Sequence, residues 1–364
     1  MLGLGDIWRP VSLTPSLTWN SLLAMTVPFA ALLLAMRLNR EDYPQLMLAI
    51  VIIACVSALL AMIQILSGIG SGVYPYRITN SGMMVGLFAN RNHHAIFQAC
   101  AVLVSAMMLR DELMRKRQSK QLILFLGFAF VLLTAMTALI GSRAGFVAGV
   151  AAFTVGYAMI VPAWRDNANA KRGVRTAPAP TRISTILQYS PPVLLAALLV
   201  TILQFSARTT SLNRVLDQSA VEDLRAQAWP TVREMVGTYW TTGSGLGSFP
   251  EVFQIFEPDA LLRPQYFNRA HNDWVEAIIG GGLPFVLIIL ALIVWLGRKI
   301  VTQDRRHLVK GYRGDPRLAM MVMLLLLAAA SFVDYPLRVP SIQVMAIMLI
   351  TMFYCNSPAP MRRD

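Results

Sequence analysis

Residues 271–296 read HNDWVEAIIGGGLPFVLIILALIVWL, and this stretch indicates what kind of protein the chain is. A polar triplet, His271-Asn272-Asp273, is followed at once by an apolar run, Trp274–Leu296, in which Glu276 is the one charged residue. Such a run is long enough to cross a bilayer, because the hydrocarbon core needs about 20 apolar residues in a helix. The stretch therefore predicts a membrane helix that begins at a polar boundary.

The composition of the whole chain repeats this apolar character. Of 364 residues, 56% are hydrophobic and 14% are charged, which excludes an ordinary soluble globule and indicates a polytopic membrane protein. We predict an all-α fold in which residues 1–364 form a single transmembrane domain with about nine helices. The predicted spans are 20–36, 46–66, 92–109, 122–140, 146–162, 186–203, 274–296, 318–334 and 342–355.

The distribution of positive charge orients these spans. With the C-terminus inside, most of the 32 lysines and arginines fall in cytoplasmic segments, which is the positive-inside bias. This bias explains the net charge of +13 without a nucleic-acid partner. We expect no cleaved signal peptide, because no basic n-region or cleavage site opens the chain. The predicted cytoplasmic segments are 37–45, 110–121, 163–185, 297–317 and 356–364.

The long polar segment 204–273 is predicted to be one loop on the outer side of the membrane. Within it, apolar residues recur at helical spacing over Val221–Val236, which predicts an interfacial helix that Pro230 should kink. Gly243–Phe249 follows as a flexible glycine-rich turn, in which backbone can approach a ligand closely. On the inner side, 163–183 is predicted to be a flexible linker.

The helix that follows the loop carries its own signals. Asp273 is expected to cap it, with Glu276 as the reciprocal partner. Three glycines at 280–282 and Pro284 should weaken it within the membrane.

Polar residues also open two other predicted spans on the outer side. In Asn90-Arg91-Asn92, both asparagines can cap a helix whose free amides favour an anion, and His93 and His94 are expected to be ordinary interfacial residues. Arg143 follows a tight turn. It either snorkels to headgroup phosphates or meets a defined anionic partner, and we favour the second because a charge at a membrane boundary needs a partner.

Two further outer arginines carry weaker signals. Arg225 lies four residues before Trp229, so it either stacks on that ring or clamps a lipid phosphate. Arg338 either pairs with Asp334 across a short turn or contributes to a site. Every basic residue of the predicted outer face is arginine, which suits bidentate contact with phosphate or carboxylate.

His271 is the best-placed candidate for chemistry among four histidines. An imidazole changes charge near neutral pH, and this one lies beside Asn272, Asp273 and a helix start, after an arginine-rich loop. A site for an anionic, membrane-bound substrate is the interpretation we favour over an ordinary interfacial histidine. The three cysteines have no metal-ligand spacing and are expected to be packing residues, so no metal site is predicted.

Taken in order, these motifs resemble the O-antigen ligase and O-antigen polymerase-like family of bacterial membrane glycosyltransferases. The resemblance covers roughly 46–340. Members usually have more spans, so we expect either a short member or a chain that begins late. The tract 237–242 also lacks the Asp-Pro that often precedes the glycine-rich turn. The matching pieces are Gly86 to Asn92, Ser142 to Gly145, Arg225 with Trp229, Gly243 to Phe249, and Ala270 to Glu276 with the glycines that follow.

The resemblance implies a metal-independent transferase of GT-C-like fold, without a cofactor, in the bacterial inner membrane and with its active site facing the periplasm. The donor would be a glycan on undecaprenyl pyrophosphate, and the acceptor a glycan or lipid A-core. His271 would be the general base, and Arg143 and Arg225 would contact the pyrophosphate. We place the other substrate contacts at Asn90, Arg91, Asn92, Asn272, Asp273, Glu276 and Arg338.

Several functions stay open at this point. Ligase, polymerase and protein O-oligosaccharyltransferase share these motifs. A lipid-linked glycan flippase or transporter is the main alternative, but it should carry charges near mid-membrane and often inverted repeats, neither of which the sequence shows. A structural scaffold of the cell envelope would not need His271.

Overall fold

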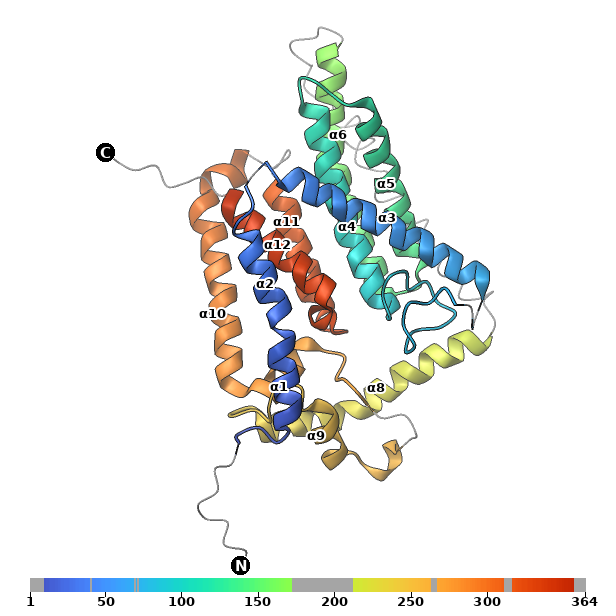
Figure 1. The fold of residues 1–364 in the computed structure, drawn as a ribbon, viewed down its shortest axis with the longest axis vertical. Helices are drawn as coiled ribbons and strands as arrows, with labels where there is room; N and C mark the ends of the chain where they lie inside the picture. The colour runs from blue at the N-terminus through green and yellow to red at the C-terminus, as the bar shows by residue number, and fades with distance from the viewer. Residues whose placement is uncertain are drawn as a thin grey trace, which may run out of the picture. The chain divides into compact units, whose positions relative to one another are not determined.

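The computed structural model describes residues 10–39, 41–68, 70, 72–171, 212–262, 267–310 and 316–356, and all regular elements in these ranges are helices (Figure 1). The described chain divides into two compact units. One holds α1, α8, α9, most of α10 and the segment Ser331–Pro340, and the other holds α3 to α6, α11 and α12. The helix α2 (Thr26–Ala35) lies at the boundary between them in the sequence.

The protein is a polytopic membrane protein. Five helical stretches of the described chain are long and apolar enough to cross a bilayer. They confirm five predicted spans, and the shorter apolar helices at Leu318–Ala330 and Pro340–Met352 correspond to the last two. The predicted span 186–203 lies outside the described residues. The five stretches are Pro15–Ala35, Tyr43–Ser67, Lys120–Leu139, Arg143–Asn169 and Asp273–Arg298.

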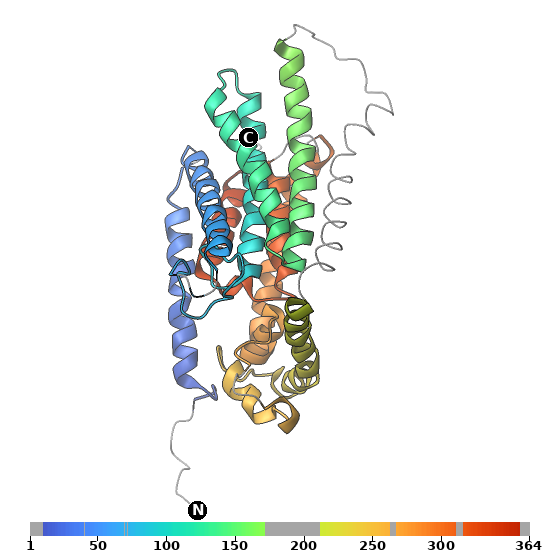
Figure 2. The same ribbon diagram turned by 90° about the vertical axis from the view of Figure 1, so that its right-hand side faces the viewer.

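The helix α4 (Arg91–Met114) is the centre of the second unit, and it corresponds to the predicted span 92–109. It lies among other helices of this unit (Figure 2). Every residue from His93 to Leu109 is buried. Its neighbours are α3 (Tyr43–Ser67), α5 (Lys120–Leu139), α6 (Arg143–Lys171) and α11 (Pro316–Ala330).

Small residues let these helices approach closely. A Cβ added at Gly145 of α6 would collide with Ala95 of α4, and one added at Gly149 would collide with Thr137 of α5. Between membrane helices such contacts replace the hydrophobic driving force, because lipid tails are as apolar as the side chains. The helix α6 also runs on to Lys171, so the first part of the predicted linker 163–183 is helical and the linker prediction is wrong there.

In the first unit, the helix α8 (Leu212–Tyr239) packs with α9 (Phe249–Phe256) and the 3₁₀ turn η1 (Asp259–Leu261). The predicted apolar stripe is real, and its members Ala228, Val232 and Met235 are buried in a core with α9. The helix is longer than predicted, and Pro230 does not divide it.

The helix α10 (Asp273–Lys310) is interrupted at Gly282, whose φ of 58° and ψ of −161° are not helical. This confirms that the glycines weaken it. The reason is a close backbone approach, because a Cβ at Gly282 would lie 2.6 Å from the carbonyl carbon of Thr242 and 2.8 Å from the carbonyl oxygen of Thr241. The remaining elements are α1 (Pro15–Ala24), η2 (Pro336–Arg338) and α12 (Pro340–Asn356).

Candidate active site

His271 is the only described non-glycine residue with a positive φ, 52°. A side chain in this left-handed region costs free energy, and such strain persists where the surrounding structure holds it, most often at functional sites. Here the residues on both sides are fixed. The Asn272 side chain caps α10 by accepting from the amide of Val275 at 3.1 Å, and it donates to the carbonyl of Phe332 at 3.0 Å.

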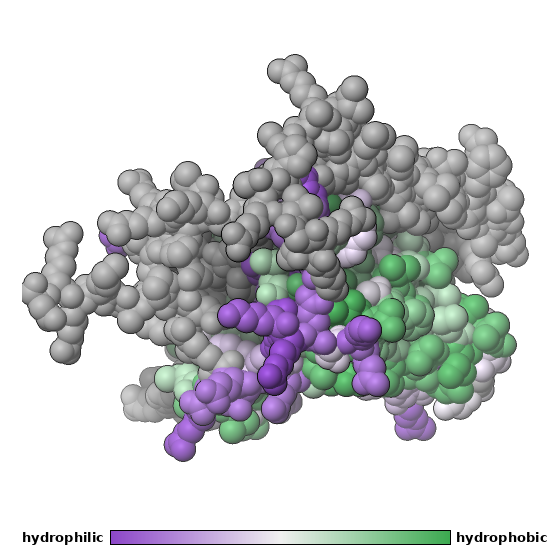
Figure 3. All heavy atoms as spheres, turned by 90° about the horizontal axis from the view of Figure 1, so that it is seen from above, coloured by the Kyte–Doolittle hydropathy of each residue, from purple (hydrophilic) through white to green (hydrophobic). Residues whose placement is uncertain are grey.

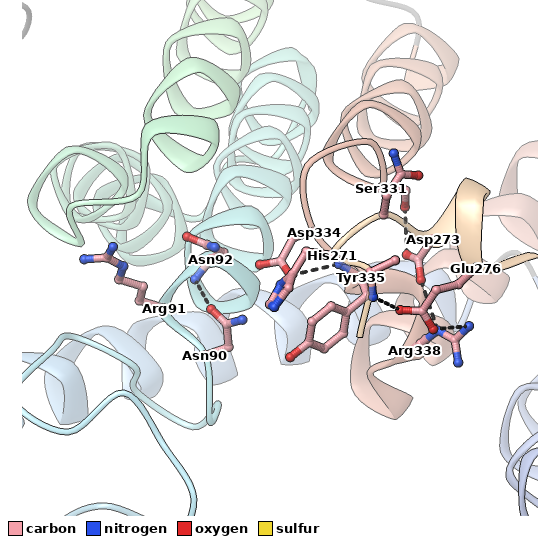
Figure 4. A network of polar contacts seen from close by, with 12 residues as sticks. Asn90, Arg91, Asn92, His271, Asp273, Glu276, Ser331, Asp334, Tyr335 and Arg338 are labelled. Carbon is pink, nitrogen blue, oxygen red and sulfur yellow. Dashed lines mark hydrogen bonds and ion pairs between the residues drawn. The ribbon is translucent and has the colours of Figure 1, made fainter. Parts of the chain in front are cut away.

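The His271 ring is oriented by an aspartate 63 residues further along the chain (Figure 4). Its Nδ1 lies 3.2 Å from Oδ1 of Asp334, which also accepts from the amide of Tyr335 at 3.0 Å. Asp334 is buried, whereas the His271 side chain keeps 20% of its surface exposed. The Tyr335 ring stands 5.2 Å from the imidazole, centroid to centroid.

This contact fixes the chemistry of the ring. An ionised carboxylate can only accept a hydrogen bond, so Nδ1 carries the proton and Nε2 of the neutral ring presents a lone pair. The same contact stabilises the imidazolium that forms when Nε2 takes a proton, as in the Ser-His-Asp arrangement. The pair can therefore act as a general base.

A second group of charged residues, Asp273, Glu276 and Arg338, lies near His271. Asp273 accepts from the Ser331 hydroxyl at 3.0 Å and from the amide of Leu337 at 3.1 Å, and its own amide donates to the carbonyl of Ser331 at 2.9 Å. These bonds tie the start of α10 to the segment 331–337. The prediction that Asp273 caps the helix is wrong, because Asn272 caps it instead.

Glu276 and Arg338 form an ion pair within this group. Arg338 Nη2 lies 2.8 Å from Oε2 of Glu276, and its Nε lies 3.5 Å from Oδ1 of Asp273. Glu276 is buried, and it also accepts from the amide of Ala270 at 2.8 Å and approaches Arg269 at 3.5 Å. A buried carboxylate in this setting is compensated by two arginines, as burial requires.

Of the two alternatives for Arg338, the structure does not show the pair with Asp334. Asp334 lies against His271, and Arg338 pairs with Glu276 and Asp273. Asp334 and Tyr335 are not among the site residues predicted from the sequence. Their only signal was position, a carboxylate and an aromatic ring in a short outer turn.

The second unit holds four other predicted contact residues, which are Asn90, Arg91, Asn92 and Arg143. Asn90 caps α4 by accepting from the amide of Asn92 at 2.8 Å, which confirms one of the two capping predictions. Arg91 opens α4, and its Nη1 would lie 4.0 Å from a Cβ at Gly141. Arg143 opens α6, after a turn in which Ser142 accepts from the amide of Gly145 at 3.0 Å, and it is exposed.

Arg91 and Arg143 thus lie at the same end of two neighbouring helices. The N-termini of α4 and α6 are together because Gly145 packs on Ala95. Helix N-termini and guanidinium groups both favour anions, so this end of the unit suits phosphate. Arg225 belongs to the first unit, where it is half-buried in α8.

His94, in contrast, is a structural residue. It is fully buried, with Nδ1 at 2.9 Å from the carbonyl of Met84 and Nε2 at 2.7 Å from the amide nitrogen of Gln98. Gln98 in turn donates to the carbonyl of Ala54 at 3.0 Å. The prediction of an interfacial residue is wrong for His94, which lies inside the bundle.

The glycine-rich turn packs closely against other parts of its own unit. Gly243, Gly245 and Gly247 all have positive φ, and the turn is bonded to α10 through the amide of Ser244 to the carbonyl of Ile279 at 2.8 Å. On its other side a Cβ at Gly247 would collide with Ser21 of α1. The glycines therefore permit close approach to the backbone of α10 at Gly243 and to serine side chains at Gly245 and Gly247.

The comparisons with known proteins bear on this arrangement. Residues 128–290 match the family described as O-antigen ligase. The matched region runs from α5 into α10, so it includes Arg143, Arg225 and His271 but not Asp334 or Arg338. No curated protein and no solved structure matches the chain. The resemblance is therefore confirmed over this region: the chain carries an O-antigen ligase family domain at residues 128–290.

Proposed function

We propose that this protein transfers a glycan from undecaprenyl pyrophosphate to an acceptor hydroxyl at the periplasmic face of the bacterial inner membrane. The observation that carries the proposal is the His271–Asp334 pair, held at 3.2 Å beside the start of a membrane helix. The family domain at 128–290 supports the substrate class, because O-antigen is a lipid-linked glycan before ligation.

The reaction we propose is a single displacement. The acceptor oxygen attacks the anomeric carbon while its proton passes to Nε2 of His271, and the bond from that carbon to the pyrophosphate oxygen breaks. The new imidazolium is stabilised by Asp334. Undecaprenyl pyrophosphate leaves as an anion, so it needs fixed positive charge more than an acid, and we assign that charge to Arg143 and Arg225.

We assign the other predicted residues either to donor binding or to positioning, according to the contacts that each makes. Asn90, Arg91 and Asn92 lie at the α4 N-terminus, where we propose that they help to bind the donor phosphates. Arg338 forms ion pairs with Glu276 and Asp273, so we propose that these three residues position the segment that carries Asp334. Asn272 holds the strained backbone of His271 through the cap.

Reconstituted proteoliposomes test the proposal against the flippase alternative. Purified protein is supplied with an undecaprenyl-pyrophosphate glycan and, in separate reactions, a glycan acceptor, a lipid A-core acceptor or an acceptor peptide. We expect a glycosylated product, which also separates polymerase, ligase and protein transferase by the acceptor used. Movement of the donor across the bilayer without any product would overturn the proposal in favour of the transporter.

Two features of the proposed enzyme need separate measurements. Metal independence predicts that transfer continues unchanged in a chelator such as EDTA. The orientation predicts that, in a cysteine-free background, a cysteine at Asp259 reacts with an impermeant reagent in spheroplasts and one at Arg117 does not. The reverse labelling pattern would place the histidine in the cytoplasm and exclude a periplasmic reaction.

A further inference from the structure

An open cavity of 870 Å³ lies at the opposite end of the second unit from Arg91 and Arg143. It is bounded by the C-terminal end of α4, the start of α5 and the last turns of α6. The positive-inside bias places this end on the cytoplasmic side. It is far along the same helices from the residues that we assign to transfer, so the proposed reaction does not account for it.

The charged lining of this cavity is mainly basic. Arg115, Lys116 and Lys120 line it, against a single acidic lining residue, Asp166. Arg115 is paired with Glu112 at 2.9 Å, so the carboxylate offsets its charge. Neither lysine has a carboxylate partner among the residues that the structure describes. The two ammonium groups are therefore the cations available to a ligand.

The loop that carries these cations is fixed to the helices around it. Glu112 accepts from the amide of Ser119 at 2.7 Å, and the Ser119 hydroxyl caps α5 by accepting from the amide of Leu122 at 3.3 Å. Gln118 donates to the carbonyl of Leu113 at 2.7 Å and to the side chain of Asn167 in α6 at 3.0 Å. The cavity is thus a built feature of three helices.

The rest of the lining is apolar and exposed. Met114, Leu124 and Trp164 expose 55%, 72% and 62% of their surface. At the end of membrane helices such side chains face lipid, and tryptophan is enriched at the level of the headgroups. Figure 3, viewed from this end of the molecule, shows hydrophilic side chains directly beside an apolar flank.

We propose that this cavity is a binding site for an anionic phospholipid of the cytoplasmic leaflet. Lys116 and Lys120 contact the headgroup phosphate, and the acyl chains follow the apolar wall formed by Met114, Leu124 and Trp164. The combination decides the ligand, because a free phosphate ion would use the cations and leave that wall exposed. Basic pockets between membrane helices on this side of the bilayer are suited to anionic headgroups.

Native mass spectrometry of the purified, delipidated protein tests the proposal. Phosphatidylglycerol and phosphatidylcholine are titrated separately, and the occupancy of each is measured for the wild type and for Lys116→Gln/Lys120→Gln. We expect a preference for phosphatidylglycerol that the double variant weakens roughly 10- to 30-fold, because each cation near the headgroup contributes about fivefold. Equal affinity of wild type and double variant for phosphatidylglycerol would overturn the proposal.

Matched variants separate the cavity from charge in general. Arg37→Gln/Arg117→Gln removes the same charge from the same predicted side without altering the cavity lining, so it should bind like the wild type. Asp166→Asn should bind phosphatidylglycerol a few-fold more tightly, which tests the site even if the lysine variant folds poorly. An equal loss in the arginine control, or displacement of the lipid by millimolar inorganic phosphate, would contradict a lipid-specific site.

Discussion

Two histidines lie close to a capping asparagine at the starts of two helices, and their surroundings give them opposite roles. His94 is fully buried in α4, and both ring nitrogens are engaged, at 2.9 and 2.7 Å. His271 stands one residue before the cap of α10 with a strained backbone, and one ring nitrogen faces a buried carboxylate. No described residue bonds its Nε2. A histidine becomes a base when the structure occupies one nitrogen and leaves the other to a substrate.

Replacing His271 should produce the largest effect. General-base assistance contributes about 10²–10⁴-fold, so His271→Ala should lose most turnover and keep donor binding. His271→Gln can hydrogen-bond but cannot take the proton, so it should be nearly as poor. Initial rates of transfer, at matched amounts of folded protein, measure this. Near-normal turnover of His271→Gln would show that His271 only positions the substrate, and the base would then have to be one of the neighbouring carboxylates.

Asp334→Asn should have the second largest effect, a loss of roughly 10- to 10³-fold in turnover. The amide keeps the shape but cannot stabilise the imidazolium, and it can hold the wrong ring tautomer. The diagnostic readout is rescue by the conservative variant, because Asp334→Glu keeps a carboxylate and should recover part of the lost turnover. Equal losses for Asp334→Asn and Asp334→Glu, in protein that remains folded, would make Asp334 a structural residue.

Replacing the arginines assigned to the donor should have a smaller effect, and it should weaken the use of the donor instead of the turnover. Arg143→Lys and Arg225→Lys keep the charge but lose the planar fork, so we expect roughly tenfold weaker use of the donor. The effect should appear mainly in the KM for the lipid donor. Arg233→Lys, on an exposed position of the same helix as Arg225, is the matched control and should behave like the wild type. Full activity of Arg143→Ala and Arg225→Ala would leave both as snorkelling residues.

His94→Ala should have the smallest effect on the reaction and a clear effect on stability. Removing the ring leaves the Met84 carbonyl and one of the two N–H groups of the Gln98 side-chain amide without a partner, and each such unsatisfied group costs about 1–3 kcal/mol where it is buried. We expect a lower midpoint of thermal unfolding in detergent, with activity per folded molecule within about twofold of wild type. A loss comparable to that of His271→Ala, in protein that remains folded, would break the comparison between the two histidines.

The residues around His271 also show which parts of a site can be predicted from the sequence. His271, Asn272, Asp273 and Glu276 were found together because they are adjacent in the chain and begin a helix. Asp334 was missed as their partner, since a carboxylate 63 residues away carries no local sign of where it will lie. The sequence likewise leaves the partner of Arg338 open, because the nearest carboxylate in the sequence, Asp334, is not the one it pairs with in space.

The sequence by itself determined the elements. Runs of apolar residues set the membrane helices, asparagine and serine set caps at α4 and α5, and glycines marked the interruption of α10, all of which depend on interactions within a few residues. The tertiary structure alone decided which histidine is buried, what the glycine-rich turn packs against and which acid orients His271. Those outcomes depend on contacts between segments far apart in the chain, and such contacts are fixed only when the helices pack and each buried polar group finds its partner.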